Sequence, residues 1–484
     1  MNFTLLQAIQ GRLLTAYGMI MLIPLLLGIY DNDPAVPAFA LTALVTIVLG
    51  LILWKKGHMK DQMGLREGFA TVAGIWILAS FIGAFPYYLS GYIPNYLDAL
   101  FETTSGFTAT GATILSDIEI LPRSLLLWRS LSHWLGGMGI IVFFILLLPR
   151  MGMGAVHLFK AEITGPDKER VSPKIRQTAM LLWGIYSGLT ISGIILLKLA
   201  GMPLFDAINH AFSCMATGGF STKNASIGAY NSWLIELILI IFMTLSGINF
   251  TIYINTWRKG RINLIRNTEL KVYLAIILLA TSVVTLSLIF QGGYEWSFAL
   301  RGAAFQVVSV MTTTGFAITD FDIWPSLAKM LLFFLMFIGG CAASTSGGLK
   351  VARIVLLFKM GVVQIKQAIH PQLVTNVFSA GKVVDPLILR NVTRFFFLFI
   401  LTFVCASTIL AAVGFEPFDA MGAAIAALGN VGPGFGVVGP ATTYASVLSL
   451  GKIVMIICMF LGRLELMTFL VLLQPDFWRN KSNW

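Results

Sequence analysis

Residues 310–319 have the sequence Val-Met-Thr-Thr-Thr-Gly-Phe-Ala-Ile-Thr and lie between two strongly apolar segments. A threonine can offer both its carbonyl oxygen and its hydroxyl oxygen to a cation. Gly315 lets the backbone adopt a left-handed turn that aims successive carbonyls in one direction. These residue types in this order predict one wall of a cation-binding filter.

Similar turns occur three more times along the chain. Aligned on one glycine each, the four turns centre on Gly111, Gly218, Gly315 and Gly432, at spacings of 107, 97 and 117 residues. A single Thr-Gly turn is common in loops, but its repetition indicates a chain built from similar units. We therefore expect all four turns to contribute to one filter.

A short amphipathic segment precedes each turn. Asp98, Asp206 and Asp419 stand 13, 12 and 13 residues ahead of the aligned glycines, whereas the third unit departs from this pattern at residues 298–301. A segment of this length forms a helix of about three turns, roughly 18 Å long, which is too short to span a bilayer. We expect re-entrant helices with these acids near the first turn and with negative C-terminal ends that point at a cation.

The composition is that of an integral membrane protein. Mean hydropathy is +0.84, 57% of the 484 residues are apolar and 11% are charged, against roughly 25% charged residues in soluble domains. The chain has no long polar block that would form a separate soluble domain. Basic loops that fix the insertion orientation explain the net charge of +11. The four cysteines are scattered singly and fit small core residues.

We predict an all-α membrane fold in which two helices precede four pore units. The helix pair occupies residues 1–66, and the units occupy 67–150, 151–260, 261–370 and 371–484. Each unit should contain a first spanning helix, a re-entrant pore helix with its turn, and a second spanning helix. The expected N-terminal helices are 13–30 and 35–54, the first helices 69–90, 178–200, 270–290 and 387–413, and the second helices 125–148, 233–257, 327–358 and 447–473.

Lysines and arginines cluster in the loops between units, while acids such as Asp117 and Asp320 lie on the side of the turns. Basic loops stay in the cytoplasm. We therefore expect both termini inside the cell and the filter facing out.

The whole plan resembles the TrkH/KtrB/HKT superfamily of potassium transporters. The similarity rests on the turns at 108–113, 216–222, 310–319 and 431–436, and the additional N-terminal helix pair makes the chain most similar to the bacterial TrkH branch. The resemblance implies potassium uptake across the bacterial inner membrane through a pore that four non-identical turns line.

The resemblance also implies which residues form the filter: Thr110, Gly111, Ala112, Thr217, Gly218, Gly219, Thr314, Gly315, Phe316, Asn430, Val431 and Gly432. Potassium would bind through the backbone carbonyls of Thr110, Thr217, Thr314 and Val431. Because Asn430 and Val431 replace threonines and Pro433 lacks an amide donor, we expect looser selectivity than in a symmetric potassium channel.

Residues 338–350 interrupt the second helix of the third unit with glycines and hydroxyl residues. Such small residues can serve close helix packing, but a broken backbone at membrane depth is also tolerated where it lines a cavity. The resemblance implies an intramembrane gating loop below the filter. Its expected residues are Gly339, Gly340, Ser344, Thr345, Ser346, Gly347, Gly348 and Lys350, together with Arg463.

Arg463 lies within the last apolar span, where an arginine is costly and usually functional. It could snorkel to the inner surface, whereas the resemblance implies a place at the pore constriction. There its guanidinium should bind the loop near residues 344–346. Glu465 should face another side of the helix and needs a different partner.

Three functional classes compete: a cation pore or symporter, an alternating-access carrier of organic solutes, and an intramembrane enzyme. A carrier should show inverted halves, and an enzyme should show convergent acids or histidines, whereas His133 and His210 are isolated and fit packing roles. We predict a non-enzymatic potassium transporter without an organic cofactor. Coupling to protons or sodium stays open, so a cation symporter with the same filter is the alternative. The family implies a cytoplasmic nucleotide-binding regulatory subunit (TrkA-like) and a homodimer, and we expect no nucleic-acid partner.

Overall fold

The computed structural model describes residues 1–57, 64–139, 175–259, 267–372, 376–379 and 382–478. Nearly all regular structure in these ranges is helical, as the sequence predicts; the exceptions are β1 (Phe378–Ser379) and β2 (Lys382–Val383), which pair antiparallel. Among the described residues, six helices are long and apolar enough to cross a membrane, or seven if one bent pair is counted as a single span. The chain is therefore a multi-pass membrane protein.

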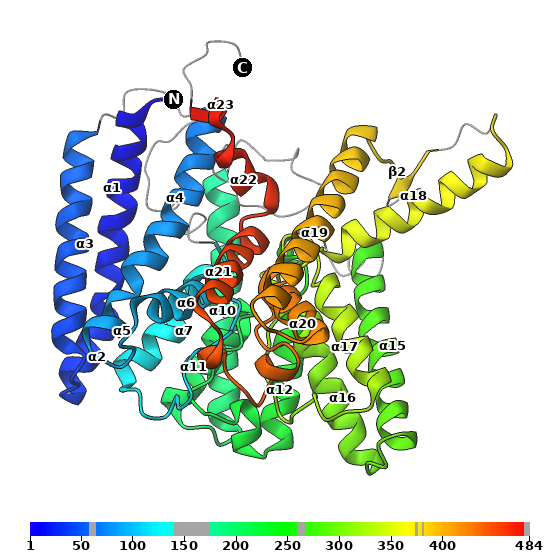
Figure 1. Ribbon diagram of the computed structural model, residues 1–484, viewed down its shortest axis with the longest axis horizontal. Coiled ribbons are helices and arrows are strands. Elements are labelled where there is room, and N and C mark those ends of the chain that lie inside the picture. Colours follow the sequence, from blue (N-terminus) through cyan, green and yellow to red (C-terminus); the bar gives the residue numbers. More distant parts are fainter. Residues whose placement is uncertain (58–63, 140–174, 260–266, 373–375, 380–381, 479–484) are drawn as a thin grey trace.

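The N-terminal pair stands at one edge of the molecule (Figure 1). It comprises α1 (Phe3–Ile20), continued by α2 (Leu22–Asp31), and the antiparallel α3 (Val36–Lys56). The first helix begins ten residues earlier than the sequence predicts, because the Asn2 side chain caps it by accepting a hydrogen bond from the Leu5 amide at 3.1 Å. A Cβ atom on Gly11 would lie 2.6 Å from the Gly50 carbonyl oxygen, so the two helices touch backbone to backbone.

The first helix of each unit matches its expected range closely. These helices are α4 (Leu65–Gly83) with its short continuation α5 (Phe85–Leu89), α10 (Ile175–Leu199), α15 (Thr268–Phe290) and α19 (Pro386–Ala412). The four pore helices also form: α6 (Tyr96–Phe107), α11 (Leu204–Ala216), α16 (Trp296–Met311) and α20 (Pro417–Leu428). Asp98, Asp206 and Asp419 lie in the first turns of three of them, as expected.

The second helices of units two, three and four differ from the sequence prediction because they are interrupted about half-way, and in unit one the described part is a single helix. They are α7 (Arg123–Gly137), α12 (Trp233–Ser246) followed by α13 (Phe250–Lys259), α17 (Ser326–Ile338) followed by α18 (Val351–Ile369), and α21 (Ser449–Arg463) followed by α22 (Leu466–Leu470). The break in the third unit is the one predicted. The unbroken spans predicted at 233–257 and 447–473 are wrong, and in the last unit the two halves bend by 115°. The predicted end of the first unit's helix at residue 148 lies outside the described residues.

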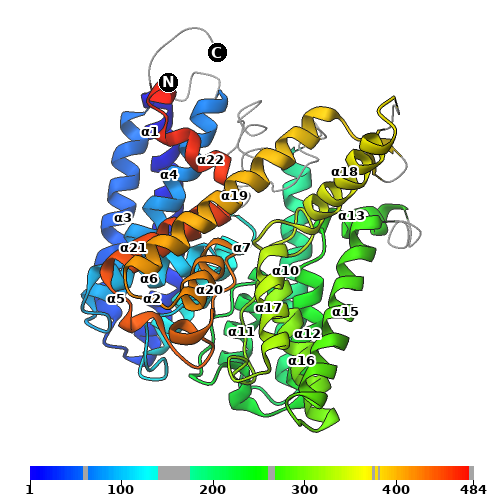
Figure 2. The ribbon, with the colours of Figure 1, turned by 45° about the vertical axis from the view of Figure 1, so that its right-hand side comes forward.

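Hydropathy misses these breaks because an apolar segment stays apolar whether or not its backbone is helical. Figure 2 shows α21 and α22 at an angle to each other and α18 sloping from the middle of the molecule to its upper right. The remaining short elements are η1 (Ser226–Tyr230), η2 (Gly436–Val438), η3 (Tyr444–Ser446), η4 (Val471–Leu473) and α23 (Pro475–Trp478).

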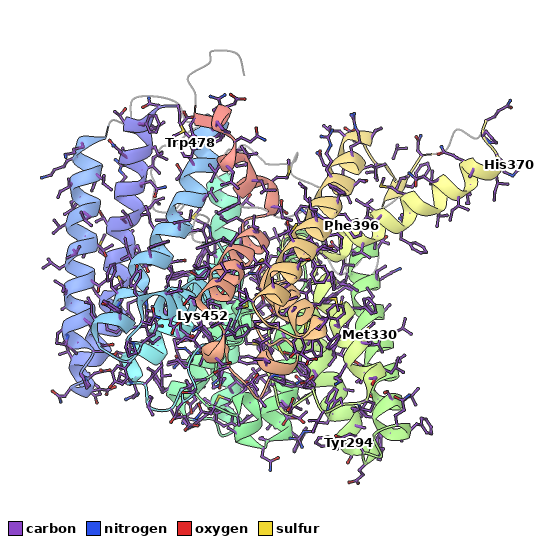
Figure 3. All side chains as sticks on the ribbon, in the orientation of Figure 1. Tyr294, Met330, His370, Phe396, Lys452 and Trp478 are labelled. Carbon is purple, nitrogen blue, oxygen red and sulfur yellow. The ribbon has the colours of Figure 1, made fainter. Side chains whose placement is uncertain are left out.

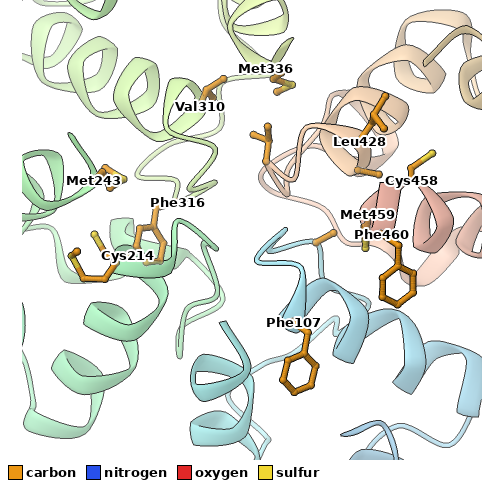
Figure 4. Packing of buried hydrophobic residues seen from close by; sticks show 14 of the residues in the cluster. Phe107, Cys214, Met243, Val310, Phe316, Met336, Leu428, Cys458, Met459 and Phe460 are labelled. Carbon is orange, nitrogen blue, oxygen red and sulfur yellow. The ribbon is translucent and has the colours of Figure 1, made fainter. Parts of the chain in front are cut away.

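The units are joined by ion pairs as well as by packing. Lys452 of α21, labelled in Figure 3, donates to Asp98 of α6 at 2.6 Å and so connects the last unit to the first. Arg301 of α16 binds Glu236 of α12 through two bonds of 2.5 Å, which connects the third unit to the second. Figure 4 shows Phe107, Cys214, Val310 and Leu428, one residue from each pore helix, arranged around the place where the four loops meet.

Candidate functional site

The four pore helices end in the same backbone conformation. A residue one or two positions after each helix end is left-handed, with φ of 52° at Ala109, 56° at Thr217, 57° at Thr313 and 54° at Asn430. Left-handed residues other than glycine are uncommon. The backbone amide of the residue that follows donates to the carbonyl oxygen of the fifth residue before it. The distance is 2.9 Å from the Thr110 amide to the Ser105 oxygen and 2.8 Å from the Thr314 amide to the Ser309 oxygen. This bond satisfies a carbonyl at the helix end, and Gly218 and Val431 make the same bond to Ser213 and Ala426.

This shared conformation corrects the predicted alignment of the second turn by one residue. Gly111, Gly315 and Gly432 have φ of 83°, 78° and 103°, and in the second unit the matching residue is Gly219 with 83°, not Gly218. Thr217 therefore corresponds to Thr313, and Gly218 corresponds to Thr314. The sequence held a signal for this register, because Asp206 lies 13 residues ahead of Gly219, the spacing found in the first and last units.

The four central glycines form a closed ring with the carbonyls of neighbouring units. A Cβ atom placed on Gly111 would lie 2.0 Å from the Gly218 oxygen, and one on Gly219 would lie 2.1 Å from the Thr314 oxygen. Likewise, Gly315 faces the Val431 oxygen at 2.1 Å, and Gly432 faces the Thr110 oxygen at 2.6 Å. No side chain fits at these positions, and the contacts run from unit one through unit four and back to unit one.

One cavity opens on this ring, and all four central glycines line it. Thr113, Ser221 and Thr442 add hydroxyl groups to its wall, and Lys223 adds an ammonium group. The left-handed residues Ala109, Thr217, Thr313 and Asn430 do not line this cavity. They lie at the other end of the turns, beside the interrupted second helices.

A buried ion pair supports the first two turns, and the sequence reasoning missed it. Arg129 and Glu102 are 1% and 0% exposed, and Arg129 Nε donates to Glu102 Oε1 at 2.8 Å. Glu102 also accepts from the Ile114 amide at 3.0 Å, while Arg129 Nη1 donates to the Ser221 carbonyl at 3.0 Å. The signal was available, since both residues interrupt apolar helices with a charge.

The two histidines are hydrogen-bonded within the same scaffold. His133 Nδ1 lies 2.9 Å from Ser213 Oγ, and its ring stacks on Phe220 with centroids 4.1 Å apart. A Cβ atom on Gly218 would lie 2.3 Å from His133 Nδ1, so this ring packs directly behind the second turn. His210 bonds to the Asp206 carbonyl at 2.7 Å and to Ser221 Oγ at 2.9 Å.

The interruption between α17 and α18 forms a compact loop of residues 339–350, which we call the intramembrane loop. The Cys341 amide donates to the Gly247 carbonyl at 2.8 Å, and the Phe250 amide donates to the Ala343 carbonyl at 3.1 Å. The loop therefore fills the break of the second unit's helix. The Ala342 amide donates to Glu269 Oε1 at 2.6 Å, which ties the loop to α15.

The predicted gate residues lie together, directly against the ends of the turns. Gly347 donates its amide to Thr313 Oγ1 at 2.7 Å, and Lys350 Nζ donates to the Ser346 carbonyl. Ser344 Oγ bonds within the loop to the Cys341 carbonyl at 2.6 Å. Of the remaining loop glycines, Gly339 and Gly348 have φ of 71° and 70°, while Gly340 accepts from the Val351 amide at 3.0 Å.

Arg463 makes the contact that the sequence predicts. Its Nη1 donates to the Thr345 carbonyl at 2.6 Å, and its Nη2 donates to the carbonyls of Gly136 and, at 2.5 Å, Gly137. Gly137 ends the second helix of unit one, and Thr345 belongs to unit three. Units one and three are opposite in the ring, so the guanidinium lies across the space beneath it. Glu465 has its own partner in Arg353, as expected.

The fold and this ring define an integral membrane transporter with pseudo-fourfold pore architecture. Residues 35–479 match the family model described as "Cation transport protein", TrkH. The "Trk system potassium uptake protein TrkH" of Salmonella typhimurium is 39% identical and that of Escherichia coli 38%, each over 99% of this chain and 100% of the relative. The crystal structure of the potassium transporter TrkH from Vibrio parahaemolyticus superposes with a TM-score of 0.89 and 36% identity, covering 99% of this chain and 100% of that chain. The chain belongs to the TrkH family of cation transport proteins.

Proposed function

We propose that this chain carries potassium ions into the cell across the bacterial inner membrane. The closed ring in which Gly111, Gly219, Gly315 and Gly432 abut the carbonyls of Thr110, Gly218, Thr314 and Val431 is the observation that carries the proposal. A dehydrated potassium ion needs such carbonyl dipoles in place of its water. The names of the similar transporters support the same ion.

The filter residues proposed from the sequence keep this role, with one change of register. The Gly218 carbonyl takes the place expected for the Thr217 carbonyl. Thr217 instead belongs with the left-handed residues Ala109, Thr313 and Asn430, at the end of the turns away from the cavity. Ala112 and Phe316 follow the ring on the side of the cavity. The intramembrane loop and Arg463 act as the gate, and the contacts of Arg463 with units one and three support this assignment.

The experiment that tests the proposal is uptake of ⁸⁶Rb⁺ and potassium into proteoliposomes that contain the purified chain. We expect flux down a potassium gradient, and a smaller flux for sodium. Imposed sodium and pH gradients then separate a channel-like pathway from a symporter. Absence of flux in a folded preparation, with the regulatory partner both absent and present, would refute the proposal.

The orientation, the partners and the unit boundaries belong to the same proposal. Basic residues such as Lys55 and Lys56 at the end of α3 support termini in the cytoplasm. A cytoplasmic nucleotide-binding regulator would dock on that basic face, and the pore chain would form a homodimer. Cross-linking in native membranes, followed by mass determination, tests both associations. The proposed unit boundaries at 150 and 260 lie outside the described residues, the one at 66 falls inside the first turn of α4, and the one at 370 follows the last residue of α18.

A further inference from the structure

Thr313 occupies a special place at the inner end of the ring. It is fully buried, left-handed and adjacent to Thr314, whose carbonyl belongs to the ring. The cavity on the other side of the ring is lined by Gly315 but not by Thr313. The Thr313 side chain is therefore at the end of the filter that an ion reaches last on its way inward.

The equivalent side chains of the other units are engaged elsewhere or apolar. Ala109 has no polar group, and Thr217 Oγ1 donates to the neighbouring Ala216 carbonyl at 2.6 Å. Asn430 Nδ2 donates to Thr110 Oγ1 at 3.0 Å and to the Met459 carbonyl at 3.1 Å. Among these four positions of the described chain, Thr313 is the one whose hydroxyl oxygen accepts a bond from the intramembrane loop.

Gly347, the loop residue that makes this bond, contacts both unit three and unit four. A Cβ atom on Gly347 would lie 2.2 Å from the Gly429 carbonyl oxygen and 3.0 Å from the Asn430 Cβ, so Gly347 fits only because it has no side chain. Its amide donates to Thr313 in unit three, while its α-carbon packs against Gly429 and Asn430 of unit four. The loop thus closes directly on the filter.

Positive charge surrounds the same contact. Arg463 binds the carbonyl of Thr345, and Lys350 binds the carbonyl of Ser346, the residue before Gly347. The N–H of Gly347 points its own partial positive charge at Thr313 Oγ1. A potassium ion that used this hydroxyl oxygen would lie beside the amide hydrogen, which is about 1.9 Å from the same atom, and the Arg463 guanidinium would repel it.

We propose that the Thr313 hydroxyl is a shared ligand, which the intramembrane loop occupies when the pore is closed and which a potassium ion occupies when the loop withdraws. This inference rests on the proposed function. Since the loop and the ion compete for one oxygen atom, the coupling is reciprocal. Ions in the innermost filter site favour the withdrawn loop, and the closed loop weakens ion binding at that site.

Hydrogen exchange of the loop amides tests this coupling on the full chain in liposomes or nanodiscs. Exchange of residues 339–350 is measured in potassium chloride and in choline chloride of equal ionic strength. We expect at least about fivefold faster exchange in potassium, the low end of typical allosteric coupling. Thr313→Val should abolish this difference and speed exchange in choline, and Thr313→Ser should restore both properties.

Thr285→Val is the control, because Thr285 is buried in α15 and its hydroxyl donates to the Thr281 carbonyl of the same helix at 2.7 Å. It should leave the potassium dependence of loop exchange intact. Equal exchange in potassium and choline for wild-type protein that still takes up ⁸⁶Rb⁺ would overturn the inference alone. Persistence of the difference in Thr313→Val, or its loss in Thr285→Val, would also overturn it. Absence of ⁸⁶Rb⁺ uptake would instead remove the proposed function.

Discussion

Individual glycines determine whether the four turns can approach one another. A Cβ atom on Gly219 would lie 2.1 Å from the Thr314 carbonyl oxygen, and a Cβ atom on Gly315 would lie 2.1 Å from the Val431 carbonyl oxygen. A side chain at either position must displace a carbonyl of the neighbouring unit and strain a left-handed backbone. We therefore expect ion selectivity at this ring to depend on the absence of a side chain at these glycines.

We predict that Gly219→Ser changes the sodium-to-potassium permeability ratio as Gly315→Ser does. Each should raise the ratio by about tenfold, equivalent to roughly 1.4 kcal/mol of lost discrimination. Reversal potentials or competitive ⁸⁶Rb⁺ uptake would measure it. An unchanged ratio for Gly219→Ser with an increased ratio for Gly315→Ser would contradict the equivalence of the two turns.

The charge of Arg463 is the second prediction at this scale. A fixed positive charge 4 Å from a permeating ion repels it by roughly 4 kcal/mol at an effective dielectric of about 20. Arg463→Gln removes that charge and should raise potassium flux. Arg463→Lys should retain most of the barrier while losing the simultaneous bonds to units one and three. Equal flux in wild type and both variants, at equal expression, would show that the guanidinium does not obstruct the pathway.

At the scale of elements, the Arg129–Glu102 pair holds α7, α6 and the second turn in one arrangement. Both side chains are buried, and each satisfies backbone groups of a filter loop. Removing one partner leaves an uncompensated buried charge, whereas removing both does not.

We predict that Glu102→Gln lowers the free energy of unfolding by about 3–5 kcal/mol, and that Glu102→Gln combined with Arg129→Met recovers part of the loss. Thermal unfolding in detergent, followed by tryptophan fluorescence, would measure both. Lys223→Met is a useful comparison, because Lys223 and its partner Glu119 are 36% and 44% exposed, so breaking their ion pair should cost less. Equal losses for the two single variants would argue against the special role of the buried pair.

At the scale of the whole molecule, the cavity on the ring, which we propose as the entrance for cations, is lined by an ammonium group. Lys223 lines this cavity and donates to Glu119 at 3.0 Å. That hydrogen bond raises the pKa of Lys223 above its usual value. The pair's contribution to stability is therefore fully present below the unfolded pKa of about 10.4 and is lost only as the pH rises through the higher folded value.

We predict that Lys223→Ala increases potassium uptake at low external potassium, because Glu119 then attracts cations without compensation. Glu119→Gln should have the opposite effect. Both effects should be equal at pH 6 and pH 8, since the lysine stays protonated, and should weaken when choline chloride is added, since salt screens exposed charges. A Lys223→Ala effect that changes between these pH values would mean that another group titrates at the entrance.

The sequence by itself determined the class of fold and the location of the turns. Hydropathy identifies spanning segments because burial in lipid requires long apolar helices, and α15 and α19 begin and end within a few residues of their predicted limits. Repetition identified the four pore helices, and the cost of a charge within a span marked Arg463.

Tertiary structure alone decided the arrangement of the site. The equivalence of Gly219 with Gly315 follows from a left-handed backbone and a carbonyl contact between units, which a sequence alignment on the first glycine does not contain. The breaks after Ser246 and Arg463 are equally invisible in an apolar segment, because other parts of the fold satisfy the freed backbone groups. The third unit's loop binds the carbonyls of Ser246 and Gly247, and Asn430 binds the carbonyl of Met459. The bond from Gly347 to Thr313 joins residues 34 positions apart within the third unit, and only tertiary packing brings the intramembrane loop into contact with the turn.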